Sequence, residues 1–287
     1  MKTAVVLDGN SLMYRMFYAT IKLSQYAVDN NLVPVNAVKL MLETCLKIRQ
    51  SNYDYCLVAF DHGKKTFRHD IMAEYKEGRK EMPKELLMQI PLIKESLQLI
   101  GFNILSLEGI EADDIIGSFT KIMTDNKIHV DIYSSDKDML QLVSDLSYVH
   151  LIKTGITNTT IYTINNFATL TAGLSPKQIP DYKVIVGDKS DNLSGVKGIG
   201  EKTGTDLIIK YHSLEDIYNN LDKLSFNLRD KFENYKQQAL VCKSIATIKT
   251  TVLDGQLIDN FVMKNIDQPS ISNFLKKYKI NGLTKYL

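Results

Sequence analysis

Carboxylate residues gather at several points of this 287-residue sequence where their spacing could support chemistry. The segment IEADDIIGSF, residues 110–119, places Glu111, Asp113 and Asp114 directly before an apolar helical pattern. Glu111 and Asp114 are three residues apart and would share one face of a helix. Helix capping is the simplest interpretation of this segment alone, because the macrodipole and free N–H groups favour negative charge at a helix N-terminus.

Other aspartates follow apolar segments that have the character of buried strands, namely TAVVLD, YCLVAF and IHVDIYSS. The segment GDKSD, residues 187–191, adds two aspartates whose spacing lets both face one way from a helical turn. Ligands of open α/β sheets gather at the carboxyl ends of the strands, so we expect these side chains to meet in one cleft. The expected cluster contains Asp8, Asp61, Glu111, Asp113, Asp114, Asp136, Asp138, Asp188 and Asp191.

So many carboxylates in one cleft would repel each other and raise their pKa values unless cations occupied the site. Hard divalent cations with oxygen ligands resolve this conflict, and Mg²⁺ keeps waters for substrate and nucleophile. No histidine or cysteine joins the group, which argues against zinc. Each strand-terminal aspartate could be a simple turn former. Their joint occurrence favours a metal site.

Alternation of strands and helices predicts a mainly parallel sheet in an α/β domain. The expected strands are 3–8, 53–61, 102–107, 128–136 and 148–152, and the expected helices are 35–50, 83–100 and 111–125, with Pro91 as a candidate kink. We expect three regions: a core of residues 1–174, a mostly helical region of residues 175–250, and a tail of residues 251–287 with one helix at SISNFLKKYK.

Residues 62–82 are basic and aromatic, and we predict a mobile, partly helical arch there. Within it, EYKEGRK at residues 74–80 could be a solvated basic loop, since charge runs usually lie on the surface. Lys76 and Arg79 are three apart, so in a helical arch they could face a single phosphate. Tyr75 could stack on an unpaired base.

The glycine-rich segment SGVKGIGEKTG, residues 194–204, fits neither a Walker loop nor a dinucleotide fingerprint, because its spacing differs from both. A helix–hairpin–helix fits better, with SPKQIPDYKVIVGD and EKTGTDLIIKYH as its helices. Such a hairpin exposes backbone N–H groups that grip phosphate without reading bases, and Lys197 and Lys202 add positive charge. A plain glycine turn between packed helices is the alternative.

The overall composition, 44% hydrophobic and 24% charged, is enough for a large core. The net charge of +2 is small, but basic patches beside acidic clusters indicate a polyanionic substrate and a metal. The three cysteines are widely spaced without a metal-type pairing, which indicates a reducing, cytoplasmic compartment. No apolar run is long enough to span a membrane, and the N-terminus lacks a signal-peptide pattern.

Five segments in order along residues 4 to about 250 resemble the bacterial 5′→3′ exonucleases, a family that includes the 5′ nuclease domains of DNA polymerase I and the flap endonucleases. They are LDGNSLMYRMFYA, AFDHGKKTFRHDIMAEYKEGRKEMP, EGIEADDIIGS, SSDKDMLQLV and VGDKSDNLSGVKGIGEKT. The resemblance implies a PIN-like nuclease core with a helical arch and a helix–hairpin–helix region. One departure is the opening VPVNAVKLML of the helix near residue 35, where relatives carry a glycine-rich start.

By the same resemblance, two divalent cations are expected, Mg²⁺ with Mn²⁺ as a substitute, and K⁺ could bind the hairpin carbonyls. Asp8, Asp61, Glu111 and Asp113 would hold one ion, the last four aspartates the other, and Asp114 would lie between. Lys76 and Arg79 are the expected catalytic cations. The expected DNA contacts are Arg15, Arg68, Tyr75, Gly195, Lys197, Gly198, Gly200, Lys202 and Thr203.

The function that this resemblance implies is two-metal hydrolysis of phosphodiesters by a stand-alone, monomeric 5′→3′ exonuclease or flap endonuclease. The expected substrates are DNA with 5′ flaps or 5′ ends and RNA primer hybrids, with DNA polymerase and ligase as partners and no membrane association. A non-catalytic DNA-binding paralogue would be expected to lose carboxylates from one metal set, and a PIN-type ribonuclease would not need the hairpin. Both remain alternatives at this point.

Overall fold

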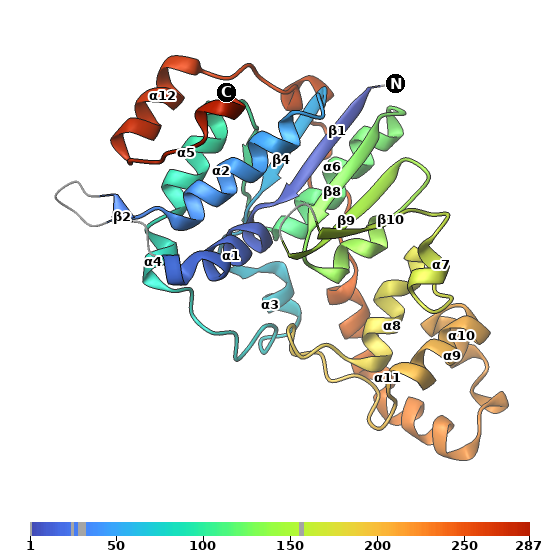
Figure 1. Cartoon of the computed structure of the whole chain (residues 1–287). Coiled ribbons are helices and arrows are strands. Elements are labelled where there is room, and N and C mark those ends of the chain that lie inside the picture. The colour runs from blue at the N-terminus through green and yellow to red at the C-terminus, as the bar shows by residue number, and fades with distance from the viewer. Residues whose placement is uncertain (1, 24–25, 28–32, 155–157) are drawn as a thin grey trace.

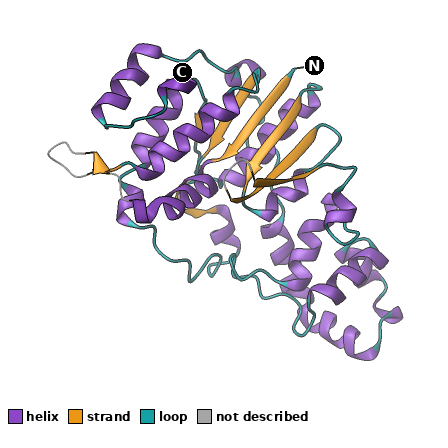
Figure 2. Cartoon of the chain, in the orientation of Figure 1, coloured by secondary structure: helices purple, strands orange, loops and turns teal. Residues whose placement is uncertain are grey.

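A six-stranded sheet lies at the centre of the computed structural model, which describes residues 2–23, 26–27, 33–154 and 158–287 (Figures 1 and 2). The strand order is β10-β9-β8-β1-β4-β6, and neighbours pair in parallel except for β10, which is antiparallel to β9. The predicted α/β class is therefore confirmed. The strands are β1 Thr3–Asp8, β4 Tyr55–Ala59, β6 Ile104–Leu105, β8 His129–Ser134, β9 Ser147–Thr154 and β10 Asn158–Tyr162.

Helices cover both faces of the sheet because its central strands are apolar on both sides. In β1, Ala4 and Val6 pack toward α6, whereas Val5 and Leu7 pack toward the helices of the opposite face. The first face carries α6 Ala112–Asp125, and the second carries α1 Gly9–Thr20, α2 Asn36–Arg49, α5 Ile90–Leu99 and α12 Gln268–Lys277. The result is a three-layer core in which the carboxyl ends of the parallel strands lie at one edge.

The observed elements differ from the expected ones in a few places. The expected strand at 102–107 is only the two-residue β6, which forms the sheet edge and pairs with β4. Helix α1 and strand β10 were not predicted. The side chain of Asp8 accepts a 2.9 Å hydrogen bond from the backbone N–H of Ser11 and so caps α1, which is a signal the sequence does contain.

The expected helix at 83–100 is two helices, α4 Lys84–Leu87 and α5, and Pro91 lies in the first turn of α5 rather than bending one long helix. Between them lies the fully buried side chain of Gln89. Its Oε1 atom accepts hydrogen bonds from the backbone N–H groups of Ala37 and Val38, at 2.9 and 3.2 Å. The backbone N–H groups at the start of α2 are thus satisfied by Gln89, from the segment between α4 and α5.

The arch and the helical region extend from the core on the side of the carboxyl edge. The arch contains β5 His62–Thr66 and α3 Phe67–Ile71, so it is partly helical as predicted, and β5 pairs with β7 Glu108–Gly109. The helical region contains α7 Phe167–Leu170, α8 Ile179–Val186, α9 Glu201–Tyr211, α10 Leu214–Asn219 and α11 Phe226–Ala246. Helices α8 and α9 are the two predicted helices that flank the hairpin.

The remaining elements are short. They are the β2 Tyr26–Ala27 and β3 Val33–Pro34 pair and the 3₁₀ helices η1 Ile21–Leu23, η2 Lys137–Leu142, η3 Pro176–Gln178, η4 Leu221–Lys223, η5 Ile258–Phe261 and η6 Thr284–Tyr286. Within the described ranges, none of the helices has the length and apolar character that crossing a bilayer requires.

The tail returns to the core and packs closely against the end of α5. The backbone N–H of Lys264 donates a 3.0 Å hydrogen bond to the carbonyl of Gly101, which has a positive φ of 88°. A Cβ atom at Gly101 would overlap the carbonyl oxygen of Lys264. Glycine is required here both for the turn and for the approach of the tail.

We predict that Gly101→Ala lowers the free energy of unfolding by about 1 to 3 kcal/mol more than Gly255→Ala does. Both glycines have positive φ, so the backbone strain largely cancels, but Gly255 has open space around it. Urea unfolding of both variants measures the difference. Equal destabilisation would show that the contact between the tail and Gly101 contributes nothing.

Candidate metal centre and nucleic-acid interface

A cleft of about 920 Å³ opens at the carboxyl edge of the sheet, between the core, the arch and the loop that follows α8. All nine predicted carboxylates lie in described segments, and eight of them line this cleft. Those eight are Asp8, Asp61, Glu111, Asp113, Asp136, Asp138, Asp188 and Asp191. The structure thus brings together residues that span more than half of the chain.

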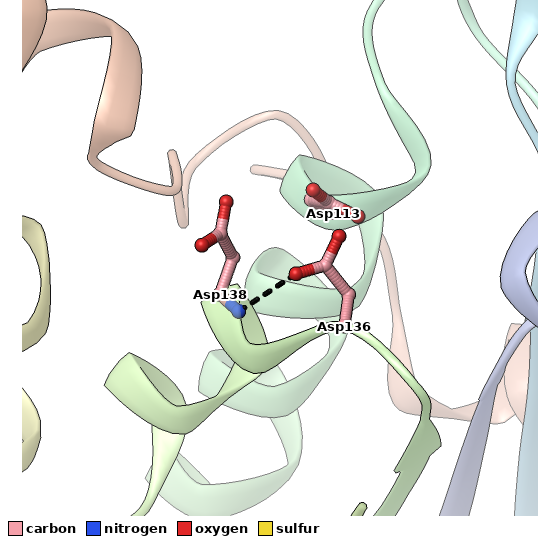
Figure 3. A group of neighbouring side chains, drawn as sticks. All are labelled: Asp113, Asp136 and Asp138. Carbon is pink, nitrogen blue, oxygen red and sulfur yellow. Dashed lines mark hydrogen bonds between the residues drawn. The ribbon is translucent and has the colours of Figure 1, made fainter. Parts of the chain in front are cut away.

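The first compact group consists of Asp113, Asp136 and Asp138, whose carboxylate oxygens lie within 4.8 Å of one another (Figure 3). Asp113 comes from the first turn of α6, and Asp136 caps η2 by accepting a 2.9 Å hydrogen bond from the backbone N–H of Asp138. Burial raises the pKa of Asp113 well above its usual value, and the nearby Asp136 and Asp8 raise it further. A cation would relieve this cost.

The second compact group consists of Asp138, Asp188 and Asp191, again with oxygens within 4.8 Å of one another. The loop that bears the last two is held by paired backbone hydrogen bonds between Asp188 and Leu193, both 2.8 Å. Asp138 belongs to both groups. Burial raises the pKa of Asp138 to about 7, and the neighbouring Asp136 contributes to the rise. The arrangement therefore suits two adjacent cations that share one ligand.

Asp8 and Asp61 are the strand-end carboxylates of the cleft, and hydrogen bonds fix both of them. Asp8 accepts from Ser134 Oγ at 2.6 Å, and Asp61 accepts from the backbone N–H of Ala112 at 2.8 Å. Burial raises the pKa of Asp8 to about 7 and also raises the pKa of Asp61. Their orientation is set by the protein before any ligand arrives.

The donor chemistry of the cleft fits hard divalent cations. Every candidate ligand atom in the two compact groups is a carboxylate oxygen, the type of ligand that these hard cations prefer. Burial raises the pKa values of Asp8, Asp113 and Asp138, and neighbouring carboxylates raise them further, so a bound cation would stabilise the charged forms.

Lys183 contacts the carboxylates of the second group and is not among the site residues expected from the sequence. It lies on α8, and its Nζ atom contacts all three carboxylates of the second group: Asp188 at 2.9 Å, Asp191 at 2.6 Å, and Asp138. Burial alone would lower the pKa of Lys183, but these carboxylates raise it above its usual value. The available signal was its position on the helix that leads directly into Asp188.

Two arch cations also reach the carboxylates. Lys76 Nζ donates to Glu111 at 2.8 Å, and Arg79 donates to Asp191 at 2.8 Å and to the carbonyl of Ser190 at 3.0 Å. Lys76 has a positive φ of 58°, an uncommon conformation for a residue with a side chain. The arch therefore rests against the second carboxylate group with both predicted catalytic cations facing the cleft.

The contacts of Glu111 show whether the IEADD segment caps the helix or contributes to the carboxylate site. It is the N-cap residue of α6, yet its side chain makes no capping hydrogen bond there and instead accepts from Lys76, Tyr75 and Thr66. Burial alone would raise the pKa of Glu111, but Lys76 and Arg68 hold it below its usual value. The start of α6 therefore positions the Glu111 carboxylate, and side chains of the arch donate hydrogen bonds to it.

Three predicted roles do not fit the structure. Asp114 is fully buried, and both of its oxygens accept from the guanidinium of Arg68 at 2.6 and 2.8 Å, so it lies outside the cleft as a structural ion pair. Arg68 is 3% exposed, so in this structure it presents almost no surface to DNA. Tyr75 is 4% exposed and donates to Glu111 at 3.1 Å, so its ring offers no open stacking face.

The hairpin residues divide into buried and exposed ones. Gly195 is buried, and a Cβ atom there would lie 2.6 Å from the backbone nitrogen of Gly187, so this glycine packs the hairpin rather than meeting a ligand. Exposed positions are Lys197, Gly198, Gly200, Lys202 and Thr203. Arg15 lies apart from the cleft, and its guanidinium donates to the carbonyl of Lys153.

Two family models together match most of the chain. Residues 3–171 match the family model described as 5′-3′ exonuclease, N-terminal resolvase-like domain, and residues 174–269 match the 5′-3′ exonuclease, C-terminal SAM fold. The chain is 43% identical to a 5′-3′ exonuclease of Mycoplasma pneumoniae over 99% of this chain and 98% of that protein. It is 41% identical to DNA polymerase I of Bacillus subtilis over all of this chain and 32% of that protein.

A solved structure shares the fold at lower identity. The bacteriophage T5 flap endonuclease, in a complex with DNA and metal ions, superposes with a TM-score of 0.68 at 20% identity, covering 97% of this chain and all of that one.

We predict that Lys183→Met lowers the free energy of unfolding in EDTA by roughly 3 kcal/mol, because three carboxylates lose their shared cation. Added Ca²⁺ should restore most of this loss and should stabilise the variant more than the wild type. Lys121→Met, which removes an exposed ion pair with Asp125, is the matched control. Thermal and urea unfolding with and without Ca²⁺ measure these effects. If Lys183→Met is as stable as wild type in EDTA, Lys183 does not balance the carboxylates.

Proposed function

The chain belongs to the 5′-3′ exonuclease family and is a nuclease, and from that premise we propose that it hydrolyses DNA phosphodiesters at 5′ ends and 5′ flaps with two divalent cations. The observation that supports this most strongly is the pair of carboxylate groups that share Asp138 in one cleft. The cleft also receives two arch cations, Lys76 and Arg79, as a nuclease acting on a polyanion requires.

The proposed cations are Mg²⁺, with Mn²⁺ as a substitute. Asp113 and Asp136 with Asp138 would hold one ion, with Asp8, Asp61 and Glu111 around it, and Asp188 and Asp191 with Asp138 would hold the other. When bound, such a pair stabilises both the attacking and the leaving oxygens of an in-line displacement. Lys183 would then leave the carboxylates that it contacts and become available to a substrate phosphate.

The arch cations would bind the scissile phosphate. Arg79 already forms directed hydrogen bonds through its guanidinium, and a guanidinium can give two parallel hydrogen bonds to a phosphate. Lys76 is a compact charge at the base of the cleft and would stabilise the oxygens on which negative charge develops. Both positions face the carboxylates from the arch, opposite the strand ends.

The hairpin would hold the duplex. Gly198 and Gly200 leave the backbone of the turn exposed, and Lys197, Lys202 and Thr203 add donors and charge at the start of α9. These groups contact phosphates, so binding should be independent of sequence. The carbonyl of Gly198 accepts a 3.2 Å hydrogen bond from Lys231, so K⁺ at the hairpin would have to share or displace this ammonium.

The proposal keeps the division into a nuclease core of residues 1–174, a hairpin region of residues 175–250 and a tail of residues 251–287. Arg15 of α1, which contacts Lys153 near the end of β9, could steer the unpaired strand. RNA primer hybrids present the same phosphodiesters.

The product would be a duplex with a nick or gap, which is the substrate of a polymerase or a ligase. The protein would act as a monomer.

The direct test is cleavage of a labelled 5′-flap duplex in Mg²⁺ and in EDTA. We predict that Asp113→Asn abolishes cleavage yet raises the melting temperature in EDTA, because the repulsion with Asp136 and Asp8 is relieved. Asp125→Asn, at the exposed far end of the same helix, should leave both quantities unchanged. Cleavage by Asp113→Asn at the wild-type rate would refute the metal assignment.

Lys76→Ala should lower the single-turnover cleavage rate by about 10²-fold or more, the scale of losing one transition-state donor. Duplex affinity in Ca²⁺ should change little because the hairpin provides most of it. Lys80→Ala, a neighbouring arch lysine that also lines the cleft, tests whether the effect is specific to Lys76. If Lys76→Ala weakens binding and leaves the chemical step unchanged, Lys76 only guides the substrate.

A further inference from the structure

Arg68 is a buried arginine that joins three parts of the molecule. From α3 in the arch, its guanidinium makes the two hydrogen bonds to Asp114 of α6 described above. Its Nε atom donates to the carbonyl of Ile245 at 2.8 Å, and one terminal nitrogen donates to the carbonyl of Thr247 at 3.3 Å. These two carbonyls lie at the C-terminal end of α11, the long helix of the hairpin region.

Hydrogen bonds connect the end of α11 and the chain that follows it to α6 and η2. We call these residues, 245–252, the crossing segment. The backbone N–H of Lys249 donates to Asp114 at 2.8 Å, and that of Val252 donates to Ser118 Oγ at 3.0 Å, both on α6. Gln141 of η2 accepts from the N–H of Ile248 at 2.9 Å. The crossing segment therefore contacts both helices that bear the first carboxylate group.

The proposed catalytic side chains are direct neighbours of these contacts in the sequence or in space. Asp114 directly follows Asp113, and the guanidinium of Arg68 lies 3.5 Å from Glu111. Gln141 belongs to the same short helix as Asp138. A displacement of α11 would thus be transmitted to the start of α6, to η2 and to the base of the arch together.

We propose that Arg68 is a positioning residue that couples the duplex-binding helices to the metal cluster. The carboxylates and the arch then take the positions that metal binding and cleavage need only when the hairpin region is correctly placed. Arginine suits this role because its planar fork offers five donors in fixed directions, which serve two carboxylate oxygens and two carbonyls at once. A lysine would keep the charge but could not span this set.

Arg68→Lys tests this role of Arg68 at constant charge. The inference rests on the metal-dependent function proposed above. The first readout is a calorimetric titration of Mn²⁺ into the full chain without DNA, where affinity should fall roughly tenfold, as is typical when a residue that orients metal ligands is lost. The single-turnover cleavage rate in Mg²⁺ should fall by a similar factor. Duplex affinity in Ca²⁺ should stay within about twofold, because phosphate contacts by the hairpin provide it.

Arg229→Lys, in an exposed ion pair with Glu233 on α11, is the control and should match the wild type. If Arg68→Lys melts earlier but binds Mn²⁺ and cleaves as the wild type does, Arg68 is a packing residue and the proposal fails. If Arg68→Lys does not fold, Asp114→Asn is measured in the same way, and wild-type Mn²⁺ affinity in that variant also overturns it. A wild-type chain without Mg²⁺-dependent cleavage would instead contradict the proposed function.

Discussion

The mutual repulsion of buried carboxylates is the constraint on which the rest of this structure depends. Eight buried or half-buried carboxylates line one cleft, and burial raises the pKa values of Asp8 and Asp138 to about 7. The fold meets this cost with cations brought from outside the sheet: Lys183 from α8, and Lys76 and Arg79 from the arch. Because these cations offset the carboxylate charge, the site keeps its geometry without metal. Its carboxylate oxygens can still bind a metal ion.

The architecture follows from that balance. Parallel strands bring their carboxyl ends to one edge, so aspartates distant in sequence meet there. The arch and the hairpin region then have to lie over this edge, because they carry the compensating charge. Their placement depends on Arg68 and the crossing segment, which tie α3, α6 and the end of α11 together. The same elements that balance the carboxylates would therefore also meet the phosphates of a substrate.

Much of this could be predicted from the sequence, because apolar runs that end in aspartate specify both a strand and a ligand position. The carboxylate cluster came from this pattern, the hairpin helices came from the glycine-rich segment between them, and the catalytic role of the arch cations came from the family resemblance. Asp114 and Arg68 could not be assigned correctly, since their spacing matches that of site residues and only their burial reveals an ion pair. Gln89 was missed because its partners lie on α2, and Lys183 was missed because its partner Asp138 lies on η2, although its position shortly before Asp188 was a local signal. Pairings across elements leave no local signal in a single sequence.

Soaking crystals in Mn²⁺ and recording anomalous scattering tests the central claim most directly. The account predicts two peaks on either side of Asp138, one beside Asp113 and Asp136 and one beside Asp188 and Asp191, with the Lys183 ammonium displaced from the second group. A cleft without a peak, with Lys183 still on its three carboxylates at saturating Mn²⁺, would contradict the account.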